Sequence, residues 1–232
     1  MAKVNRNTVV VLNVGSPVLM SKWLGQVPAI VNAWFPGQEG GHAIADILFG
    51  DANPSGKLPV TFLKAEKDSP AYGHYPGENS EVEYAEGIYV GYRHFDKHDI
   101  QPLFPFGFGL SYTKFAYSDL KVSPAKAGAD QPVEVSLKLA NSGQRAGAEV
   151  VQLYLHDVKS SLDRPVKELK AFERVELKPG EARTVTFKLD KSAFSYFDPA
   201  KKGWVAEPGA FEVQAGSSSR DIRLRGVFEL TK

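Results

Sequence analysis

The hydrophobic pattern changes period near residue 116, and this change divides the chain into two regions. In the first region, residues 8–14 and 29–34 form largely apolar runs that are rich in β-branched side chains. Runs of this kind are typical of parallel strands that are covered on both faces. In the second region apolar and polar residues alternate, as they do over residues 133–139. The pattern therefore predicts an α/β region followed by an all-β region.

A short helix is predicted after the second apolar run. Its apolar face is formed at positions i, i+3 and i+4 by Ile44, Ile47 and Leu48. Gly50 stands where a left-handed C-terminal cap is expected. Residues 57–62 are predicted to be extended, and Pro59 restricts them to the edge of a sheet because proline cannot donate to a ladder.

Residues 65–115 are predicted to connect the two regions. Residues 63–80 are polar and rich in proline, glycine and tyrosine, which favours a crossing loop on the surface. Residues 84–95 are expected to be ordered and to have an extended backbone. Residues 104–115 interleave aromatics with glycines, so tight turns and large apolar side chains can fill a domain junction. We place the boundaries at 1–64, 65–115 and 116–232.

The second region is predicted to be an antiparallel sandwich of about seven strands. Turn signals such as Asn141-Ser142-Gly143 and Pro208-Gly209 separate its alternating segments. These segments are residues 133–139, 151–156, 169–177, 185–189, 211–215 and 222–228. A true immunoglobulin domain is not expected, because the sequence has no Cys…Trp…Cys core signature.

The composition is that of a globular protein, with 43% hydrophobic residues, 24% charged residues and a formal net charge of +1. This balance gives no electrostatic reason to expect nucleic acid or an anionic membrane as a partner. The absence of cysteine excludes disulfides and thiolate metal sites. No apolar run reaches the roughly 18 residues of a membrane span. We expect no cofactor and no metal ion.

The loop before the predicted helix contains the most conspicuous candidate residue, Glu39. A carboxylate between a strand and a helix could serve catalysis, but we favour a structural role in which it interacts with the helix dipole. Gly37, Gly40 and Gly41 match neither nucleotide-binding spacing, G-x-G-x-x-G or G-x-x-x-x-G-K-[ST]. We expect them to permit tight packing against the neighbouring strand.

Other polar candidates lie between residues 86 and 99. Glu86 and Arg93 are expected to form a buried pair that braces the crossover, with a contact to substrate at the rim of a cleft as the alternative. His94 and His98, which accompany Asp96 and Asp99, are spaced i, i+4. That spacing aligns metal ligands only on a helix, and Pro102 with the neighbouring aromatics favours a loop, so we predict no metal site.

Trp204 is the aromatic candidate of the all-β region. It could stack on a sugar, as aromatics of carbohydrate-binding modules do, but core packing is the preferred interpretation. An exposed row of two or three aromatics on one face would reverse that preference.

Nine motifs occur in a fixed order along the chain. In the first half they are NVGSP at 13–17, WFPGQEGG at 34–41, NPSGKLP at 53–59, YVGYR at 89–93 and FPFGFGLSY at 104–112. In the second half they are RPVKEL at 164–169, LKPGE at 177–181, YFD at 196–198 and VQAGSS at 213–218. Together they resemble the C-terminal portion of glycoside hydrolase family 3, which includes β-glucosidases and β-xylosidases. The resemblance covers essentially the whole chain.

The resemblance implies that residues 1–64 are the C-terminal part of a truncated α/β sandwich domain. It implies that residues 116–232 are a fibronectin type III-like, immunoglobulin-like sandwich. In the family the nucleophile is an Asp on a barrel domain, and the acid/base is commonly a Glu early in the α/β domain. Neither corresponds to a residue of this chain, so the resemblance implies no catalytic, cofactor-binding or metal-binding residue here.

Two functions are compatible with these observations. The first is the C-terminal region of a β-glucosidase-like enzyme that hydrolyses terminal β-linked glycosides with retention. Carbohydrate would then bind only with the missing barrel, in the same polypeptide or in an N-terminal partner chain. The second is a stand-alone carbohydrate-binding or structural interaction module without catalysis. Family members are often periplasmic or secreted and some are cytoplasmic, so the resemblance leaves the compartment open.

The first region is expected to be the less stable part. Two strands of a parallel sheet leave an open edge and an uncovered apolar face when the rest of the sheet is absent. We therefore expect residues 1–62 to be less stable than the sandwich that begins at residue 116.

Overall fold

The computed structural model describes all residues from 1 to 232 and divides into two compact units. The first unit comprises Met1–Pro54 and Leu58–Phe106, and the second comprises Ser55–Lys57 and Gly107–Lys232. The short segment Ser55–Lys57 therefore belongs to the second unit although the first unit surrounds it in the sequence. None of the helices is both long enough and apolar enough to cross a membrane.

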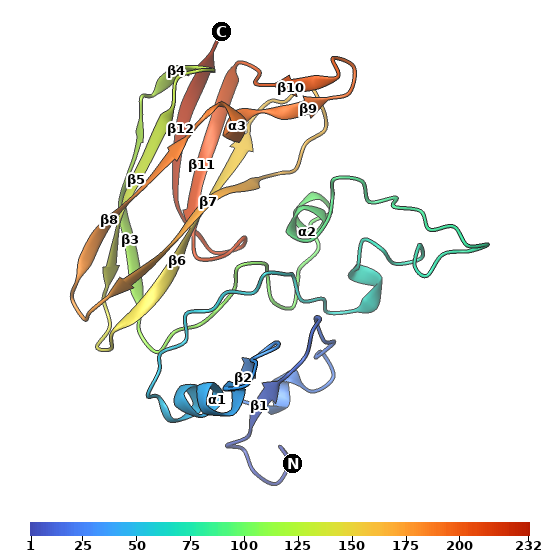
Figure 1. Ribbon diagram of the computed structural model, residues 1–232, viewed down its shortest axis with the longest axis vertical. Helices are drawn as coiled ribbons and strands as arrows, with labels where there is room; N and C mark the ends of the chain where they lie inside the picture. The colour runs from blue at the N-terminus through green and yellow to red at the C-terminus, as the bar shows by residue number, and fades with distance from the viewer. The chain divides into compact units, whose positions relative to one another are not determined.

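The first unit begins with a parallel pair of strands (Figure 1). Strand β1 (Val9–Leu12) pairs with β2 (Ala29–Asn32), and a 3-10 turn, η1 (Leu24–Gln26), lies between them. Helix α1 (Gly40–Phe49) follows, and Gly50 caps it with a left-handed φ of 84°. The predicted parallel strands, the helix and its glycine cap are thus confirmed.

The expectation that these strands are covered on both faces is wrong for this chain. Val9 and Val11 of β1 are exposed, and so are Phe35 and Phe49, which flank or end the next elements. Parallel sheets normally have both faces covered by helices, whereas this sheet has only two strands. The apolar run therefore has the composition of a covered strand, but no element of this chain covers its exposed side chains.

The rest of the first unit is mostly turns around a small aromatic core. Its helical elements are η2 (Glu66–Asp68) and α2 (Tyr92–Lys97). Phe62 and Phe95 are buried, and Phe62 N–H donates to the carbonyl of Phe104 at 2.9 Å. Residues 57–62 were expected to be extended, and they reach a ladder only as an isolated bridge from Phe62 to Phe104.

The prediction of an extended segment over residues 84–95 is wrong. The chain forms turns there and then helix α2, which begins after Gly91 at a φ of 54°. The helix turns Phe95 into the core, where only 2% of it is exposed. Because α2 has only six residues, its stability comes from this packing rather than from an amphipathic pattern that the sequence could reveal.

The second unit is a sandwich of two sheets with a small ribbon (Figure 1). One sheet has the order β4-β12-β11-β6-β7 and the other the order β3-β5-β8, while β9 and β10 form the ribbon. All pairs are antiparallel except β12 with β4. The elements are β3 (Phe115–Ser123), β4 (Lys126–Gly128), β5 (Val133–Asn141), β6 (Gly147–Asp157), β7 (Glu168–Leu177), β8 (Ala182–Leu189), α3 (Lys191–Phe194), β9 (Tyr196–Asp198), β10 (Gly203–Val205), β11 (Gly209–Gly216) and β12 (Ile222–Thr231).

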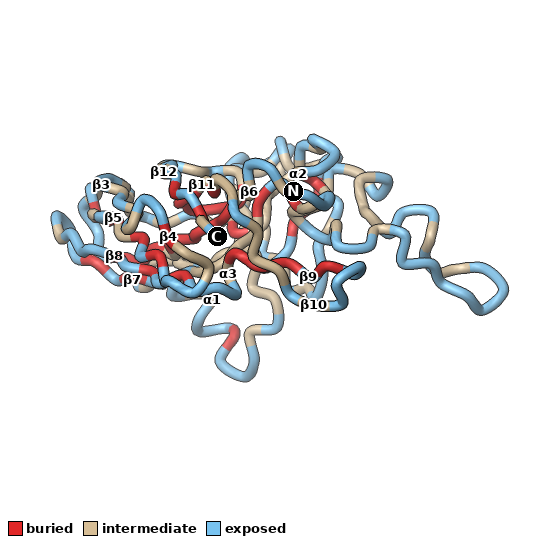
Figure 2. The backbone as a smooth tube through the Cα atoms, turned by 90° about the horizontal axis from the view of Figure 1, so that it is seen from above, coloured by how far each residue is buried: buried red, intermediate tan, exposed pale blue.

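The core of the sandwich lies between its two sheets. Buried positions gather along its strands in Figure 2, and β5 alternates buried with exposed or half-buried residues as predicted. The core joins Val135 and Leu137 of β5 to Val151 and Leu153 of β6, with Phe211 of β11 in the same cluster. The all-β prediction is therefore confirmed, with eight strands in the two sheets instead of about seven.

Strand β6 departs from the predicted alternation. Its polar positions Gln152 and Tyr154 are as buried as the apolar residues between them. In an antiparallel sheet of a sandwich, the outward face normally meets solvent. A strand that is buried on both faces must satisfy its outward polar groups with protein partners, and those partners form the site described next.

Candidate functional site

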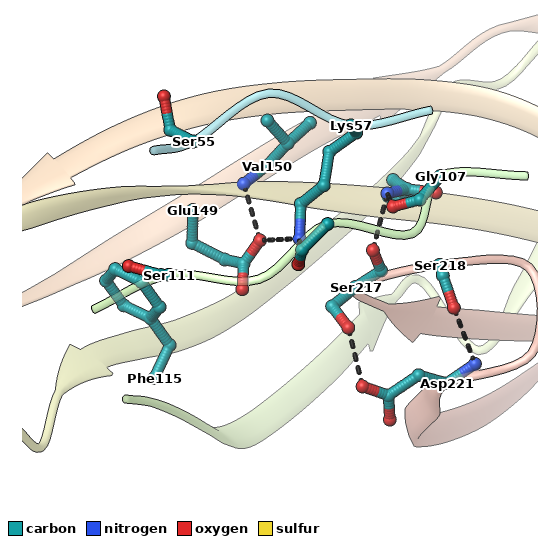
Figure 3. Close-up of polar contacts among 12 residues, drawn as sticks. Ser55, Lys57, Gly107, Ser111, Phe115, Glu149, Val150, Ser217, Ser218 and Asp221 are labelled. Carbon is teal, nitrogen blue, oxygen red and sulfur yellow. Dashed lines mark hydrogen bonds and ion pairs between the residues drawn. The ribbon is translucent and has the colours of Figure 1, made fainter. Parts of the chain in front are cut away.

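A polar cluster covers the outward side of β6 within the second unit (Figure 3). We call it the junction cluster and define it by its six members. They are Lys57, Gly107, Gly109, Glu149, Gln152 and Ser217. Two of its chain segments are Ser55–Lys57 and the stretch that begins at Gly107. Both belong to the second unit and begin directly after a segment of the first unit in the sequence.

The centre of the junction cluster is an ion pair between Lys57 and Glu149. Lys57 Nζ lies 2.7 Å from Glu149 Oε1, and the two side chains are 12% and 7% exposed. Lys57 Nζ also donates to the carbonyl of Gly109 at 3.2 Å, and the Val150 amide donates to Glu149 Oε1 at 2.8 Å. Buried charges persist only when they are paired and hydrogen-bonded, and both conditions hold here.

Gln152 makes the second connection of the junction cluster. Its amide Nε2 donates to the carbonyl of Gly107 at 3.1 Å and to the carbonyl of Ser217 at 2.7 Å. Its Oε1 accepts from the Tyr154 hydroxyl at 2.6 Å. One side chain of β6 therefore holds the incoming segment at Gly107 and the loop after β11 at the same time.

The glycines of the aromatic–glycine motif are explained by how closely the backbone approaches this cluster. Gly107 has a φ of 80°, and a Cβ there would lie 2.1 Å from Gln152 Oε1. A Cβ on Gly109 would lie 2.2 Å from the carbonyl oxygen of Gly56. A side chain at either position would push two chain segments apart, so the motif permits their contact.

Arg223 of β12 and Asp221, which precedes that strand, form a pair that adjoins the junction cluster through Ser217. Arg223 Nη2 donates to Asp221 Oδ2 at 2.8 Å, and its guanidinium lies 4.8 Å from the centre of the Tyr117 ring. Hydrogen bonds from Arg223 lower the pKa of Asp221 despite partial burial. Burial, followed by the charge of Glu149, raises the pKa of the Tyr117 hydroxyl, so this phenol stays neutral.

The chemistry of this arrangement is that of a brace. The ammonium of Lys57 faces a carboxylate and a carbonyl, and the carboxylate of Glu149 faces an ammonium and an amide. A catalytic acid or base must instead reach the reacting group of a substrate. The junction cluster fastens Ser55–Lys57 and the segment from Gly107 to the sandwich.

The sequence did not single out Lys57, Glu149 or Gln152. One usable signal was Glu149, a charged residue beside the apolar run of β6, because a charge within a strand that is buried on both faces requires a partner. Its partner Lys57 lies far away in the sequence, so no local pattern indicates their pairing.

Glu39 has the structural position that was expected. It is the residue at the start of α1, its side chain is exposed, and its Oε2 lies 2.9 Å from His42 Nδ1. A Cβ on Gly40 would lie 2.7 Å from the Pro36 ring, whereas a Cβ on Gly41 would meet nothing within 4 Å. The tight packing at Gly40 therefore involves Pro36 and not a neighbouring strand.

His94 lies on helix α2 and His98 is the C-cap residue that follows it, so the expectation of a loop at this point is wrong. The rings of His94 and His98 are 4.8 Å apart. Burial, and then the nearby His98, lower the pKa of His94. The structure holds no group of three or more histidine, aspartate or glutamate side chains that could bind a metal ion. Asp96 lies within the helix and Asp99 follows it.

Glu86 and Arg93 lie in the turns before α2 and in its first turn, and both are half-buried. The predicted pairing between them stays a prediction.

The position of Trp204 contradicts the preferred sequence interpretation. It was expected in the core, but 74% of it is exposed on β10.

Two family models match the chain. Residues 1–92 match the glycosyl hydrolase family 3 C-terminal domain, and residues 149–219 match a fibronectin type III-like domain. The thermostable beta-glucosidase B of Acetivibrio thermocellus is 52% identical over 224 residues, which are 97% of this chain and 30% of that protein. A beta-glucosidase of Rhizobium radiobacter is 46% identical over 96% of this chain and 27% of its own length.

The chain belongs to glycoside hydrolase family 3. Solved structures agree: the GH3 beta-glucosidase of Bifidobacterium adolescentis superposes with a TM-score of 0.94 at 42% identity, covering 99% of this chain and 34% of that one. Beta-glucosidase 3B of Thermotoga neapolitana, solved in complex with α-D-glucose, gives a TM-score of 0.91 at 42% identity over 97% of this chain and 31% of its own.

The family 3 chain corresponds to the C-terminal part of these enzymes and spans about a third of their length. The predicted fold class, part of an α/β domain followed by a fibronectin type III-like sandwich, is confirmed. The catalytic barrel of the family is not among the residues of this chain.

Proposed function

We propose that this chain is the C-terminal region of a β-glucosidase-like enzyme and that its role is to complete and brace the catalytic assembly. The observation that supports this most strongly is the match to the Acetivibrio enzyme, 52% identical over 97% of this chain but over only 30% of that enzyme. The enzyme would hydrolyse terminal β-linked glucosides with retention of configuration.

The chemistry requires the barrel. Retaining hydrolysis uses two carboxyl groups about 5–5.5 Å apart, one as nucleophile and one as acid/base. The carboxylate in the junction cluster is engaged by Lys57, and Glu39 is exposed beside a helix start. We assign neither of them a catalytic role. The nucleophile and the acid/base would come from the barrel and the first half of the α/β domain.

The first unit supports a role in completing a larger domain. Its parallel sheet ends after two strands, and Val9, Val11, Phe35 and Phe49 expose apolar side chains. An open strand edge with an uncovered apolar face is a surface that pairs with further strands and helices. The N-terminal part of the enzyme, in the same polypeptide or in a partner chain, would cover it.

The test is reconstitution. This chain is mixed with a polypeptide that comprises the part of the Acetivibrio relative preceding the matched region, and hydrolysis of p-nitrophenyl β-D-glucoside is followed. We expect no hydrolysis by either polypeptide alone and hydrolysis by the mixture. Val11→Lys, which places a charge on the open sheet, should prevent reconstitution, whereas the same change at exposed Val227 of the sandwich should not. Turnover by this chain alone would contradict the proposal.

A further inference from the structure

The ribbon formed by β9 and β10 presents two aromatic side chains on one face. Phe197 and Trp204 stand directly opposite each other in the antiparallel register. They are 51% and 74% exposed, and their ring centroids are 6.0 Å apart with an interplanar angle of 77°. Large aromatic side chains gain by leaving water, so an exposed pair of this kind indicates a surface that binds something.

The opposite face of the ribbon is fixed to the sandwich. The Tyr196 hydroxyl lies 2.9 Å from Ser161 Oγ and donates to Glu207 Oε2 at 3.1 Å. The guanidinium of Arg164 lies 5.0 Å from the centre of the Tyr196 ring. The ribbon therefore presents its two exposed rings from a braced support, which lowers the entropy lost when a ligand is bound.

Arg164 is itself held firmly. Its Nη1 donates to Asp157 Oδ2 and its Nη2 to Glu168 Oε2, both at 2.9 Å. At the turn of the ribbon, Asp198 Oδ1 accepts from the amides of Ala200 and Lys201. These contacts stabilise the base and the tip of the ribbon independently of its exposed face.

The charges around the two rings indicate the class of ligand. Lys201 Nζ lies 3.3 Å from Asp198 Oδ2, so these two charges largely cancel, and Lys202 is the other basic residue of the turn. Binding to anionic lipid uses clusters of about four to eight basic residues, which the turn does not provide. The small net charge of the turn favours a neutral ligand over a strongly charged one.

The geometry of the rings fits a sugar. Because the planes of the two rings stand at 77°, the pair is edge-to-face and its two exposed surfaces meet at an angle. A β-linked glucose residue has equatorial hydroxyls around its rim and axial C–H groups on its faces. Those C–H groups are weakly positive and match the negative face of an aromatic ring.

We propose that the Phe197–Trp204 face is a binding site for a neutral β-linked glucan chain. One glucose residue stacks on Trp204, and Phe197 closes one side of that position. The choice of β-linked glucose rests on the proposed function, whereas the site itself rests on the exposed aromatic pair. The site would hold the enzyme near polymeric or oligomeric substrate.

The experiment uses the whole 232-residue chain labelled with ¹⁵N. Its three tryptophans give three indole N–H signals, and the one that disappears in Trp204→Phe belongs to Trp204. Cellopentaose and soluble mixed-linkage β-glucan are then titrated. We expect the Trp204 signal to shift in a saturable manner, and we expect Trp204→Ala to weaken binding about fivefold or more.

Phe172→Ala is the matched control, because Phe172 is 68% exposed on β7, which belongs to the five-stranded sheet and not to the ribbon. This variant should bind glucan as the parent does. An unmoved Trp204 signal at millimolar glucan, or equal binding by Trp204→Ala, would overturn the proposal. The N-terminal part of the Acetivibrio enzyme is also added without glucan. If it shifts the Trp204 signal and binds Trp204→Ala more weakly than the parent, the face is a protein interface and the proposal is overturned.

The two proposals can fail separately. Reconstituted hydrolysis of p-nitrophenyl β-D-glucoside, which contains a single glucose residue and no glucan chain, should be unchanged in Trp204→Ala. Glucan binding without reconstituted hydrolysis would reject the enzymatic role and keep the site. Reconstituted hydrolysis without glucan binding would reject the site and keep the enzymatic role.

Discussion

Lys57 Nζ lies 2.7 Å from Glu149 Oε1, and this ion pair is almost completely withdrawn from solvent. It joins a segment of three residues to the outward face of a strand that is buried on both sides. The pair explains why a charged residue is tolerated within β6.

Removing one partner of this ion pair should destabilise the second unit strongly. In Glu149→Gln, the ammonium of Lys57 remains buried without its counter-charge, which costs about 3–5 kcal/mol. The change is measured as the free energy of unfolding in urea. The double variant Lys57→Met with Glu149→Leu should recover much of the loss, because it removes both charges.

A surface pair provides the control for this prediction. Lys126 Nζ lies 2.6 Å from Glu229 Oε2 with both side chains largely exposed, so Glu229→Gln should cost less than about 1 kcal/mol. A similar loss in both variants would mean that burial of the Lys57–Glu149 pair contributes nothing.

Alanine at Gly109 should separate two chain segments of the junction. Its Cβ would lie 2.2 Å from the carbonyl oxygen of Gly56, which is backbone and cannot rotate away. We expect Gly109→Ala to destabilise the second unit by about 1–3 kcal/mol, measured by thermal unfolding. Gly41→Ala is the control, since a Cβ there meets nothing within 4 Å and alanine favours a helix by about 0.5–1 kcal/mol. Equal stability of the two variants would contradict the close approach.

The sequence predicted those features that depend on neighbouring residues. The apolar runs of β1 and β2, the face of α1 with its Gly50 cap, and the alternation of β5 are all local signals. They depend on side-chain period and on the conformational freedom of glycine. For the same reason the order of the motifs was sufficient to indicate the family.

What the sequence did not predict depends on contacts between distant residues. Helix α2 forms with Phe95 almost completely buried, and a six-residue element carries too few positions to show a period. Gln152 looked solvent-facing by alternation, but it is covered through its bond to Gly107. Trp204 lies on a short ribbon whose exposed face no alternation marks, since each of its strands has three residues.

Acidification should weaken the first unit through His94. Burial and the nearby His98 lower the pKa of His94 in the folded state, so the folded form favours the neutral ring. Its contribution is complete above the unfolded pKa of about 6.5 and is lost as the pH falls below that value, because the unfolded chain then binds the proton more readily. Thermal unfolding of the first unit should therefore occur at lower temperature at pH 5 than at pH 7.5.

The His94→Gln variant should show a smaller difference between these two pH values. His42→Gln is the control, because it makes the same change at an exposed histidine of the same unit. A pH dependence that is the same in His94→Gln and in the parent would exclude His94 as its source.

Amide hydrogen exchange should protect the sandwich far more than the first 62 residues. The sandwich buries a continuous core that includes Val151, Leu153 and Val213, whereas β1 exposes Val9 and Val11. Local opening is easiest where few apolar contacts must be broken, so the amides of β1 and β2 should exchange well before those of β5, β6 and β11. Equal protection in both parts would show that two parallel strands and one helix are self-sufficient. In the reconstituted mixture the amides of β1 should slow, because an added strand would bond to its open edge, while those of β6 should stay unchanged.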